Sequence, residues 1–168
     1  MNLAIRPATP SDIRAVLHLF DDAIEWFTSI GNDGQWGTER WSTQDKQIAR
    51  ITDACSQSGA WVAEGAELGL CGFLVLGDAM PYVEPPSEPE IYVRVLVGSR
   101  DQRVKGVGRR LLAFADEQAR AAGVGRLRVD CYAGGSGALV SFYESCGYER
   151  ISTFMDEDWP GQLLGRSL

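Results

Sequence analysis

The sequence predicts a single α/β domain over residues 1–168, with helices on both faces of a mixed central sheet. Three observations support this fold class. The length of 168 residues corresponds to one ordinary domain. Apolar positions switch between helical spacing and short strand-like runs along the chain. In the second half, a strand, a helix and a strand follow one another within about 40 residues, the pattern of a parallel βαβ crossover.

The first elements are predicted to be a strand and two helices. Residues 3–8 alternate like a short strand, and Thr9-Pro10-Ser11-Asp12 is a capping box with proline at the first helical position. The apolar stripe of the helix that follows continues to Phe27, and Gly31-Asn32-Asp33-Gly34 marks its end. A second helix is expected to begin at Ser42-Thr43-Gln44-Asp45.

The middle of the chain is predicted to form a hairpin and a central strand. Two apolar runs, 60–63 and 68–76, flank Glu64-Gly65-Ala66-Glu67, whose composition suits a turn between antiparallel strands. Prolines at four positions between Met80 and Pro89 exclude a helix or an internal strand, so this stretch should be a loop. The strand that follows, Ile91 to Val97, is the most apolar of the chain.

The second half is predicted to alternate helices and strands. The expected elements are a helix over 107–122, a strand over 127–132, a helix over 137–146, and strands over 150–155 and 162–168. Because a helix connects the strands 91–97 and 127–132, these two should be parallel neighbours. The hairpin makes the first half of the sheet antiparallel.

Composition excludes several classes of function. The net charge of −7 disfavours a nucleic-acid partner, which would require a surplus of Lys and Arg. No run reaches the roughly 18 apolar residues of a membrane span. The amino terminus lacks the features of a secretory signal, so we expect a cytoplasmic protein without a membrane partner. Four separated cysteines and one histidine, His18, provide neither a disulfide framework nor a metal site.

The most informative segment is Arg103-Val104-Lys105-Gly106-Val107-Gly108-Arg109-Arg110, where a loop meets a helix. Glycines allow the backbone to approach a ligand, and the first N–H groups of a helix attract anions. Residues 94–110 carry a net charge of +5 within a chain of −7, so the remainder carries −12. A P-loop would need Ser or Thr after Gly-Lys, and a dinucleotide fingerprint would need glycine at Leu111. The alternative is an arginine-bearing helix start that binds nothing.

Two motifs resemble those of the GNAT family of N-acetyltransferases. Arg103-x-x-Gly106-x-Gly108 after an apolar strand is similar to the Gln/Arg-x-x-Gly-x-Gly/Ala signature that binds the pyrophosphate of acetyl-coenzyme A in that family. Residues 139–148 resemble a later motif, in which a helix with a Phe-Tyr pair ends in glycine and an aromatic residue. The resemblance covers nearly the whole chain and implies the GNAT fold and acetyl-coenzyme A as cosubstrate; the residue content leads us to expect no metal.

The chain also departs from this family's pattern. Ser136 stands where the family often has asparagine, which puts that coenzyme contact in doubt. The loop from Val97 to Arg103 is slightly longer than the commonest form. The coenzyme-binding residues implied by the resemblance are Val95, Leu96, Val97, Arg103, Val104, Lys105, Gly106, Val107, Gly108, Arg109, Ser136 and Tyr143.

The resemblance implies that Tyr143 is the general acid, since a phenol of pKa near 10 can protonate a thiolate whose conjugate acid has a pKa near 8.5. Core packing alone would explain the ring but not its hydroxyl. Glu90 is the candidate general base, at the mouth of the central strand. Glu88, Asp130, a water-mediated base and no base at all are the alternatives.

The acceptor is expected to be the amine of a small molecule. The candidate lining residues are Phe27, Trp36, Trp41 and Tyr82. Aromatic faces near acidic groups suit a cationic amine, although filling the edge of the core explains the two tryptophans slightly better. The alternative functions are a coenzyme-binding sensor without catalysis and an acetyltransferase acting on protein amino termini or lysines. A thiol enzyme is disfavoured because no histidine would activate a cysteine. The oligomeric state stays open, a homodimer included.

Overall fold

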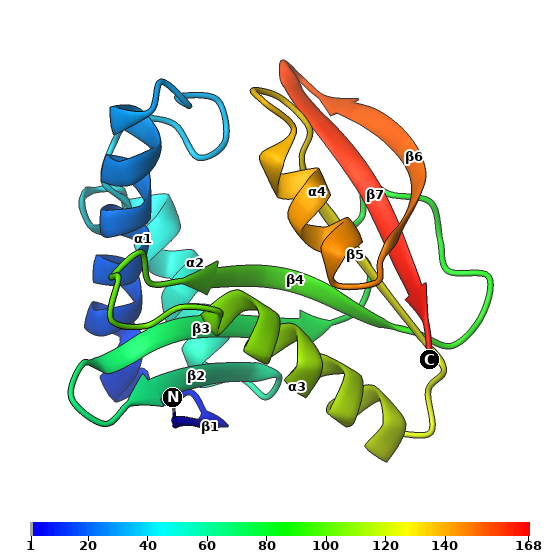
Figure 1. Ribbon diagram of the computed structural model, residues 1–168, viewed down its shortest axis with the longest axis horizontal. Helices are drawn as coiled ribbons and strands as arrows, with labels where there is room; N and C mark the ends of the chain where they lie inside the picture. Colours follow the sequence, from blue (N-terminus) through cyan, green and yellow to red (C-terminus); the bar gives the residue numbers. More distant parts are fainter. Residues whose placement is uncertain (1) are drawn as a thin grey trace. The chain divides into compact units, whose positions relative to one another are not determined.

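The computed structural model describes residues 2–168 and contains a seven-stranded mixed sheet (Figure 1). The strands are β1 (Leu3–Pro7), β2 (Ala60–Gly65), β3 (Gly69–Gly77), β4 (Ile91–Gly98), β5 (Arg126–Tyr132), β6 (Glu149–Asp156) and β7 (Trp159–Ser167). The helices are α1 (Ile13–Ser29), α2 (Asp45–Ser56), α3 (Val107–Ala121) and α4 (Ala138–Ser145), with 3-10 turns η1 (Pro10–Asp12) and η2 (Trp41–Thr43). The strand order is β1-β2-β3-β4-β5-β7-β6.

The predicted elements are confirmed, with small differences at their ends. β2 pairs antiparallel with β3, and β4 pairs parallel with β5 from Ile91 opposite Leu127 to Val93 opposite Val129. The largest difference is that β7 begins at Trp159 rather than Gln162. A tight turn brings Asp156 opposite Trp159, so the hairpin extends through Pro160, a residue that argues against a strand in the sequence.

The chain divides into two compact units. The first runs to Val75 and includes Val95–Leu111, and the second consists of Leu76–Arg94 and Leu112–Leu168. β3, β4 and α3 therefore contribute residues to both units. No helix within residues 2–168 has the length and apolar character needed to cross a membrane.

The start of α1 is fixed by the predicted capping box. The backbone N–H of Thr9 donates to the Asp12 carboxylate at 2.8 Å, and the Arg6 guanidinium donates to both oxygens of the same carboxylate. The hydrogen bond from Arg6 is the main reason that the pKa of Asp12 lies below its usual value. The turn η1 leads from this box into α1.

In the first unit, α1 and α2 cover one face of the sheet. The buried stripe of α1 includes Val16, Phe20 and Ile24, at the predicted helical spacing. These side chains belong to the same core as Val62 and Phe73, which lie opposite each other on β2 and β3. The next residues along each strand point to the other face, where the first turns of α3 lie (Figure 1).

The start of α3 packs closely on β3 because of Gly72. A Cβ atom at Gly72 would lie 2.6 Å from Cγ1 of Val107 and 2.9 Å from Cδ1 of Leu111. Both of these side chains are buried, and Gly72 lies opposite Ala63 on β2. Two small residues on neighbouring strands therefore make room for the beginning of the helix.

Replacement of Gly72 by alanine is expected to lower the free energy of unfolding by about 1–3 kcal/mol, because the added methyl overpacks this contact. Urea denaturation followed by circular dichroism measures the change. Gly125→Ala is the matched control, since a Cβ there meets no atom within 4 Å. Equal stability of the two variants would contradict the prediction.

The second unit places helix and loop on opposite faces of β5, β7 and β6. Val140 and Tyr143 of α4 are buried, and α4 packs against β5 and β6. Arg128 and Asp130 share one face of β5 because alternate residues point the same way. The proline-rich loop, predicted correctly as irregular, covers this face: the carbonyl oxygen of Glu84 accepts a hydrogen bond from Arg128.

Candidate active site

The first unit contains the glycine-bearing loop that the sequence singled out. The loop leaves β4 at Gly98, where a Cβ atom would lie 3.3 Å from Cβ of Val107. The N–H of Ser99 donates to the carbonyl oxygen of Cys71 at 2.7 Å, which ties the loop to β3. Gly106 has a φ of +77° and open space around it, so glycine is the residue that forms this turn without strain.

The loop carries its own internal acid, Asp101. Its carboxylate accepts hydrogen bonds from the backbone N–H and from two guanidinium nitrogens of Arg103. The side-chain bond from Arg103 is the main reason that the pKa of Asp101 falls to about 2. Arg103 remains 70% exposed, although Asp101 occupies one edge of its guanidinium. The sequence analysis did not predict this contact, because it counted Asp101 only as one negative charge within a basic segment.

The start of α3 presents backbone donors and cations together. The N–H of Arg110 donates to the carbonyl oxygen of Gly106 at 3.0 Å, which is the first turn of the helix. The N–H groups of Val107 and Gly108 precede it and have no acceptor within the helix. The side chains of Lys105 and Arg109 are exposed. A diphosphate fits this arrangement, because donors, helix dipole and positive charge converge.

Several residues predicted to bind coenzyme have buried side chains, so only their backbone groups can contact a ligand. The side chains of Val97, Val104 and Val107 are buried in the first unit, whereas those of Val95 and Leu96 are half-buried. Main-chain groups of such residues can still bind a ligand. Ser136 is exposed, in a loop where Gly135 and Gly137 have positive φ values.

In the second unit, α4 holds Tyr143 in a buried position. Burial is the main cause that raises the pKa of Tyr143 well above its ordinary value, and the charge of Asp130 adds to it. Tyr143 is therefore a neutral phenol, the protonation state that a general acid requires. The ring of Tyr148 lies edge-on at 5.8 Å between centroids.

The Gly-Tyr pair after α4 has a structural explanation. Gly147 has a φ of +91°, and a Cβ there would lie 1.9 Å from a guanidinium nitrogen of Arg166. The turn lets the N–H of Tyr148 donate to the carbonyl oxygen of Tyr143 at 3.1 Å. The motif thus positions both aromatic rings at the carboxyl end of the helix.

Glu90, the expected general base, forms a buried ion pair instead. Its two carboxylate oxygens accept hydrogen bonds from Nε and a terminal nitrogen of Arg128 at 2.6 and 2.8 Å. The two side chains are only 4% and 3% exposed. A buried guanidinium already neutralises the charge of this carboxylate, so this geometry does not support the expectation that Glu90 takes a proton from an acceptor. In this structure Glu90 is the ion-pair partner of Arg128.

Asp130 lies on the same face of β5 and has different partners. Its carboxylate accepts a short hydrogen bond from the phenol of Tyr92 and bonds from the phenol of Tyr82 at 3.2 Å. Burial is the first cause, and the bond to Asp130 the second, that raises the pKa of Tyr92, so this phenol stays a donor. Glu88, a further alternative, is exposed and lies 3.8 Å from Arg126.

The aromatic candidates for acceptor contact divide into buried and exposed residues. Trp41 is buried and stacks on Phe20 at 4.0 Å between centroids. Phe27 is buried as well, and Trp36 is half-buried, 5.5 Å from Phe27. The tryptophans therefore fill the edge of the core, as the favoured interpretation predicted. Tyr82 is 43% exposed, with its ring 5.5 Å from Phe154.

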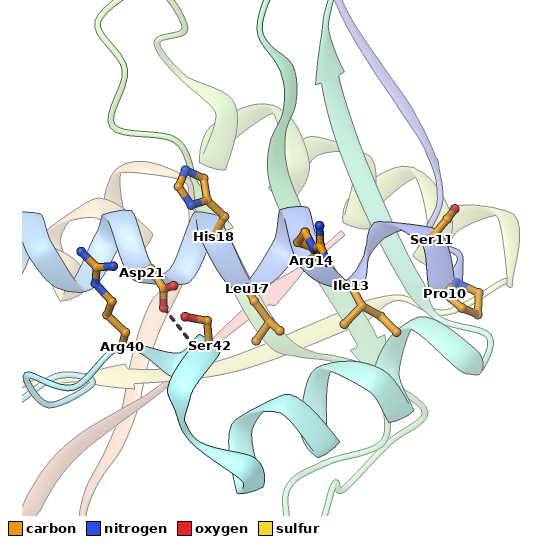
Figure 2. A pocket seen from close by; sticks show the side chains of 9 residues that line it. All are labelled: Pro10, Ser11, Ile13, Arg14, Leu17, His18, Asp21, Arg40 and Ser42. Carbon is orange, nitrogen blue, oxygen red and sulfur yellow. Dashed lines mark hydrogen bonds between the residues drawn. The ribbon is translucent and has the colours of Figure 1, made fainter.

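A separate cleft lies beside α1. It has a volume of about 600 Å³ and is lined by Pro10, Ser11, Ile13, Arg14, Leu17, His18, Asp21, Arg40 and Ser42 (Figure 2). None of the residues expected to bind coenzyme or acceptor lines it. The Asp21 carboxylate accepts the N–H of Ser42 at 3.1 Å, and His18 is an exposed helix residue 3.5 Å from Asp22. His18 thus lies on the helix surface, as expected.

The four cysteines are free thiols. Burial raises the pKa of Cys131 to about 12 and that of Cys55 to about 11, which disfavours the reactive thiolate. Within residues 2–168, no group of three or more histidine, cysteine or acidic side chains is arranged to hold a metal ion.

Comparison with known proteins identifies the family. The family model described as "Acetyltransferase (GNAT) family" matches residues 18–148. The chain belongs to the GNAT family of acetyltransferases. This GNAT protein is 30% identical over 170 residues to the L-methionine sulfoximine/L-methionine sulfone acetyltransferase of Pseudomonas aeruginosa, covering 100% of this chain and 91% of the relative. The resemblance found in the motifs and the assignment as an N-acetyltransferase are thereby confirmed.

Solved structures show the GNAT fold. The chain superimposes on a GNAT acetyltransferase of Listeria monocytogenes with a TM-score of 0.73 and 16% identity, over 99% of this chain and 95% of the other. The PaiA N-acetyltransferase of Thermoplasma acidophilum, in complex with coenzyme A, gives a TM-score of 0.65 and 17% identity, with 100% of both chains covered. The predicted α/β architecture of the GNAT protein is therefore confirmed.

Proposed function

We propose that this GNAT protein transfers the acetyl group of acetyl-coenzyme A to the amine of a small molecule, by direct attack in a ternary complex. The observation that carries the proposal is the start of α3, where the N–H groups of Val107 and Gly108 and the exposed Lys105 and Arg109 would together bind a diphosphate. The cytoplasmic location and the single-domain organisation expected from the sequence are part of the same proposal.

The reaction requires a neutral amine, a held carbonyl and a proton for the leaving thiolate. The backbone of Val95, Leu96 and Val97 would hold the pantetheine arm and its thioester. As the amine nitrogen bonds to the carbonyl carbon, the carbon–sulfur bond breaks and Tyr143 protonates the sulfur. The neutral state of Tyr143 supports this role. Ser136 and Arg103 are the further coenzyme contacts of the proposal.

The amine nitrogen also loses a proton when it becomes an amide, and Asp130 is proposed as the general base that accepts this proton. Its carboxylate accepts hydrogen bonds from the phenols of Tyr82 and Tyr92, whereas Glu90 is held by a guanidinium. The charge of Asp130 also contributes to the raised pKa of Tyr143, although burial is the main cause. The proposal therefore replaces the base expected from the sequence.

The acceptor class is proposed to be small amines of the amino-acid type. The relative from Pseudomonas aeruginosa is named for L-methionine sulfoximine and L-methionine sulfone, which supports a small acceptor. The exposed ring of Tyr82 and the half-buried ring of Trp36 are the aromatic candidates for contact, and Phe27 and Trp41 support Trp36 from within the core.

The test is release of coenzyme A thiol from acetyl-coenzyme A with a panel of acceptors. The panel contains L-methionine sulfone, a polyamine, a peptide with a free amino terminus and a lysine peptide. We expect release with the amino acid and a product heavier by one acetyl group. Release only with the peptides would favour a protein acetyltransferase. Coenzyme binding without release for any acceptor would favour a sensor module.

Gly108→Asp is expected to abolish the rise in melting temperature that coenzyme A causes, because it places a carboxylate against the diphosphate. Thermal unfolding with and without coenzyme A measures this shift. Ala113→Asp is the matched control, since it adds the same charge to an exposed position of α3 beyond its first turn. An undiminished shift in Gly108→Asp would contradict the diphosphate site.

A further inference from the structure

Arg100 is the feature of the first unit that neither the motifs nor the proposed reaction uses. Its guanidinium carbon lies 4.0 Å from the ring centroid of Trp26 and 5.3 Å from that of Phe27. Arg6, Arg103 and Arg128 each pair with a carboxylate. For Arg100, by contrast, the described chain from residue 2 onward holds neither an ion-pair partner nor a side-chain hydrogen bond.

The contact with the aromatic ring leaves the N–H donors of Arg100 available to bind an anion. The guanidinium carbon lies over the ring of Trp26, and its five N–H donors lie in the guanidinium plane. Partial desolvation lowers the pKa of Arg100, and no nearby carboxylate offsets it. Contact with an aromatic ring restricts the conformations of a guanidinium, so a planar anion can bind it in the bidentate manner at lower entropic cost.

The position of Arg100 limits what that anion can be. It belongs to the loop between β4 and α3, directly before Asp101 and the diphosphate-binding segment. Its aromatic platform is the carboxyl-terminal part of α1, where Phe27 contacts the ring of Trp36 at 5.5 Å. A carboxylate bound here would therefore lie beside an aromatic residue proposed for the acceptor, on the loop that leads to the coenzyme site.

We propose that Arg100 binds the carboxylate of the acceptor, so that this enzyme acetylates free amino acids in preference to amines without a carboxylate. The inference rests on the proposed function, because it concerns the acceptor of that reaction. It assigns to Arg100 a role in specificity, because two N–H groups of its guanidinium would donate to the two oxygens of one carboxylate.

The experiment compares L-methionine sulfone with its carboxamide as acceptors for the full chain. Arg100→Gln is expected to lower kcat/KM for the acid by about 10- to 100-fold, the usual range for a lost charged hydrogen bond, and to leave the carboxamide within about twofold. Arg100→Lys should give an intermediate loss, because lysine keeps the charge but not the fork. Melting temperatures establish that the variants fold.

Arg50→Gln is the matched control. The guanidinium carbon of Arg50 lies over the ring of Trp41, 5.5 Å from its centroid, so this variant also removes an arginine from a tryptophan ring in the same unit. It should leave the ratio of acid to carboxamide unchanged. If Arg100→Gln lowers both acceptors equally, or raises only the KM for acetyl-coenzyme A, Arg100 is a loop anchor and the proposal is wrong.

A binding measurement separates this inference from the proposed function. Calorimetry of L-methionine sulfone and its carboxamide, with coenzyme A present, requires no turnover. Binding of the acid alone, lost in Arg100→Gln, would support the carboxylate site even if no thiol were released and the proposed function had failed. If thiol is released but the ratio of kcat/KM for the acid to that for the carboxamide is unchanged in Arg100→Gln, the inference is wrong and the proposed function is still supported. Absence of both binding and release would overturn both.

Discussion

Arg128→Ala is expected to lower the free energy of unfolding by about 3–5 kcal/mol, because it leaves the buried carboxylate of Glu90 without its partner. Both side chains are almost fully buried, and the guanidinium also donates to the carbonyl oxygen of Glu84 at 2.9 Å. One substitution thus removes both guanidinium donors to Glu90 and one of the hydrogen bonds between the proline-rich loop and β5. Urea denaturation measures the loss from the shift of the transition midpoint.

The double variant Glu90→Gln/Arg128→Met tests whether the loss comes from the unpaired charge. It should be more stable than Arg128→Ala, because replacing both members of a buried pair removes the desolvation cost along with the attraction. A double variant as unstable as the single one would mean that packing of the arginine stem, and not the charge, holds this region.

The same variants decide which carboxylate accepts the proton. The folded double variant should keep most of its kcat, because Glu90 has a structural role. Asp130→Asn should lower kcat by roughly 100-fold or more, the usual range for removal of a general base. Loss of kcat in the double variant together with an active Asp130→Asn would return the role of base to Glu90.

Tyr143→Phe is expected to lower kcat by about 100- to 1,000-fold, because the leaving thiolate loses its proton donor. The ring stays in place, so the contact with Tyr148 and the melting temperature shift caused by coenzyme A should change little. Steady-state kinetics with the best acceptor measures kcat, and thermal unfolding checks coenzyme binding. Unchanged turnover would contradict the assignment of the general acid.

Tyr148→Phe is the matched control for Tyr143→Phe. The hydroxyl of Tyr148 is buried and has no hydrogen-bond partner among residues 2–168. Its removal should keep kcat and leave stability equal or slightly higher, since a buried polar group without a partner is unfavourable. Equal losses of kcat in both variants would indicate that α4 is sensitive to any lost hydroxyl.

The pH dependence gives a second criterion. The pKa of Tyr143 lies well above 10, so its phenol stays protonated through the assay range and kcat should show no alkaline fall from its ionisation. A fall with an apparent pKa below 9 that disappears in Tyr143→Phe would contradict the buried, neutral state of the phenol.

Local sequence features predicted the order of elements and the glycine turn before α3 correctly. The stripe of Val16, Phe20 and Ile24 and the box at Thr9 to Asp12 define α1 through spacings within a few turns. Gly106 marks a turn with positive φ, and such a requirement can be read from one residue and its neighbours. The family motifs are of this local kind as well.

Only the tertiary structure determined which residues far apart in the chain form hydrogen bonds and ion pairs. Glu90 and Arg128, like Tyr92 and Asp130, are 38 residues apart, and the parallel register of β4 and β5 brings each pair together. A carboxylate near the mouth of a strand looks like a base in the sequence, whether or not a guanidinium covers it. Register and burial decide which carboxylate is neutralised, because an ion pair depends on distances that local spacing does not determine.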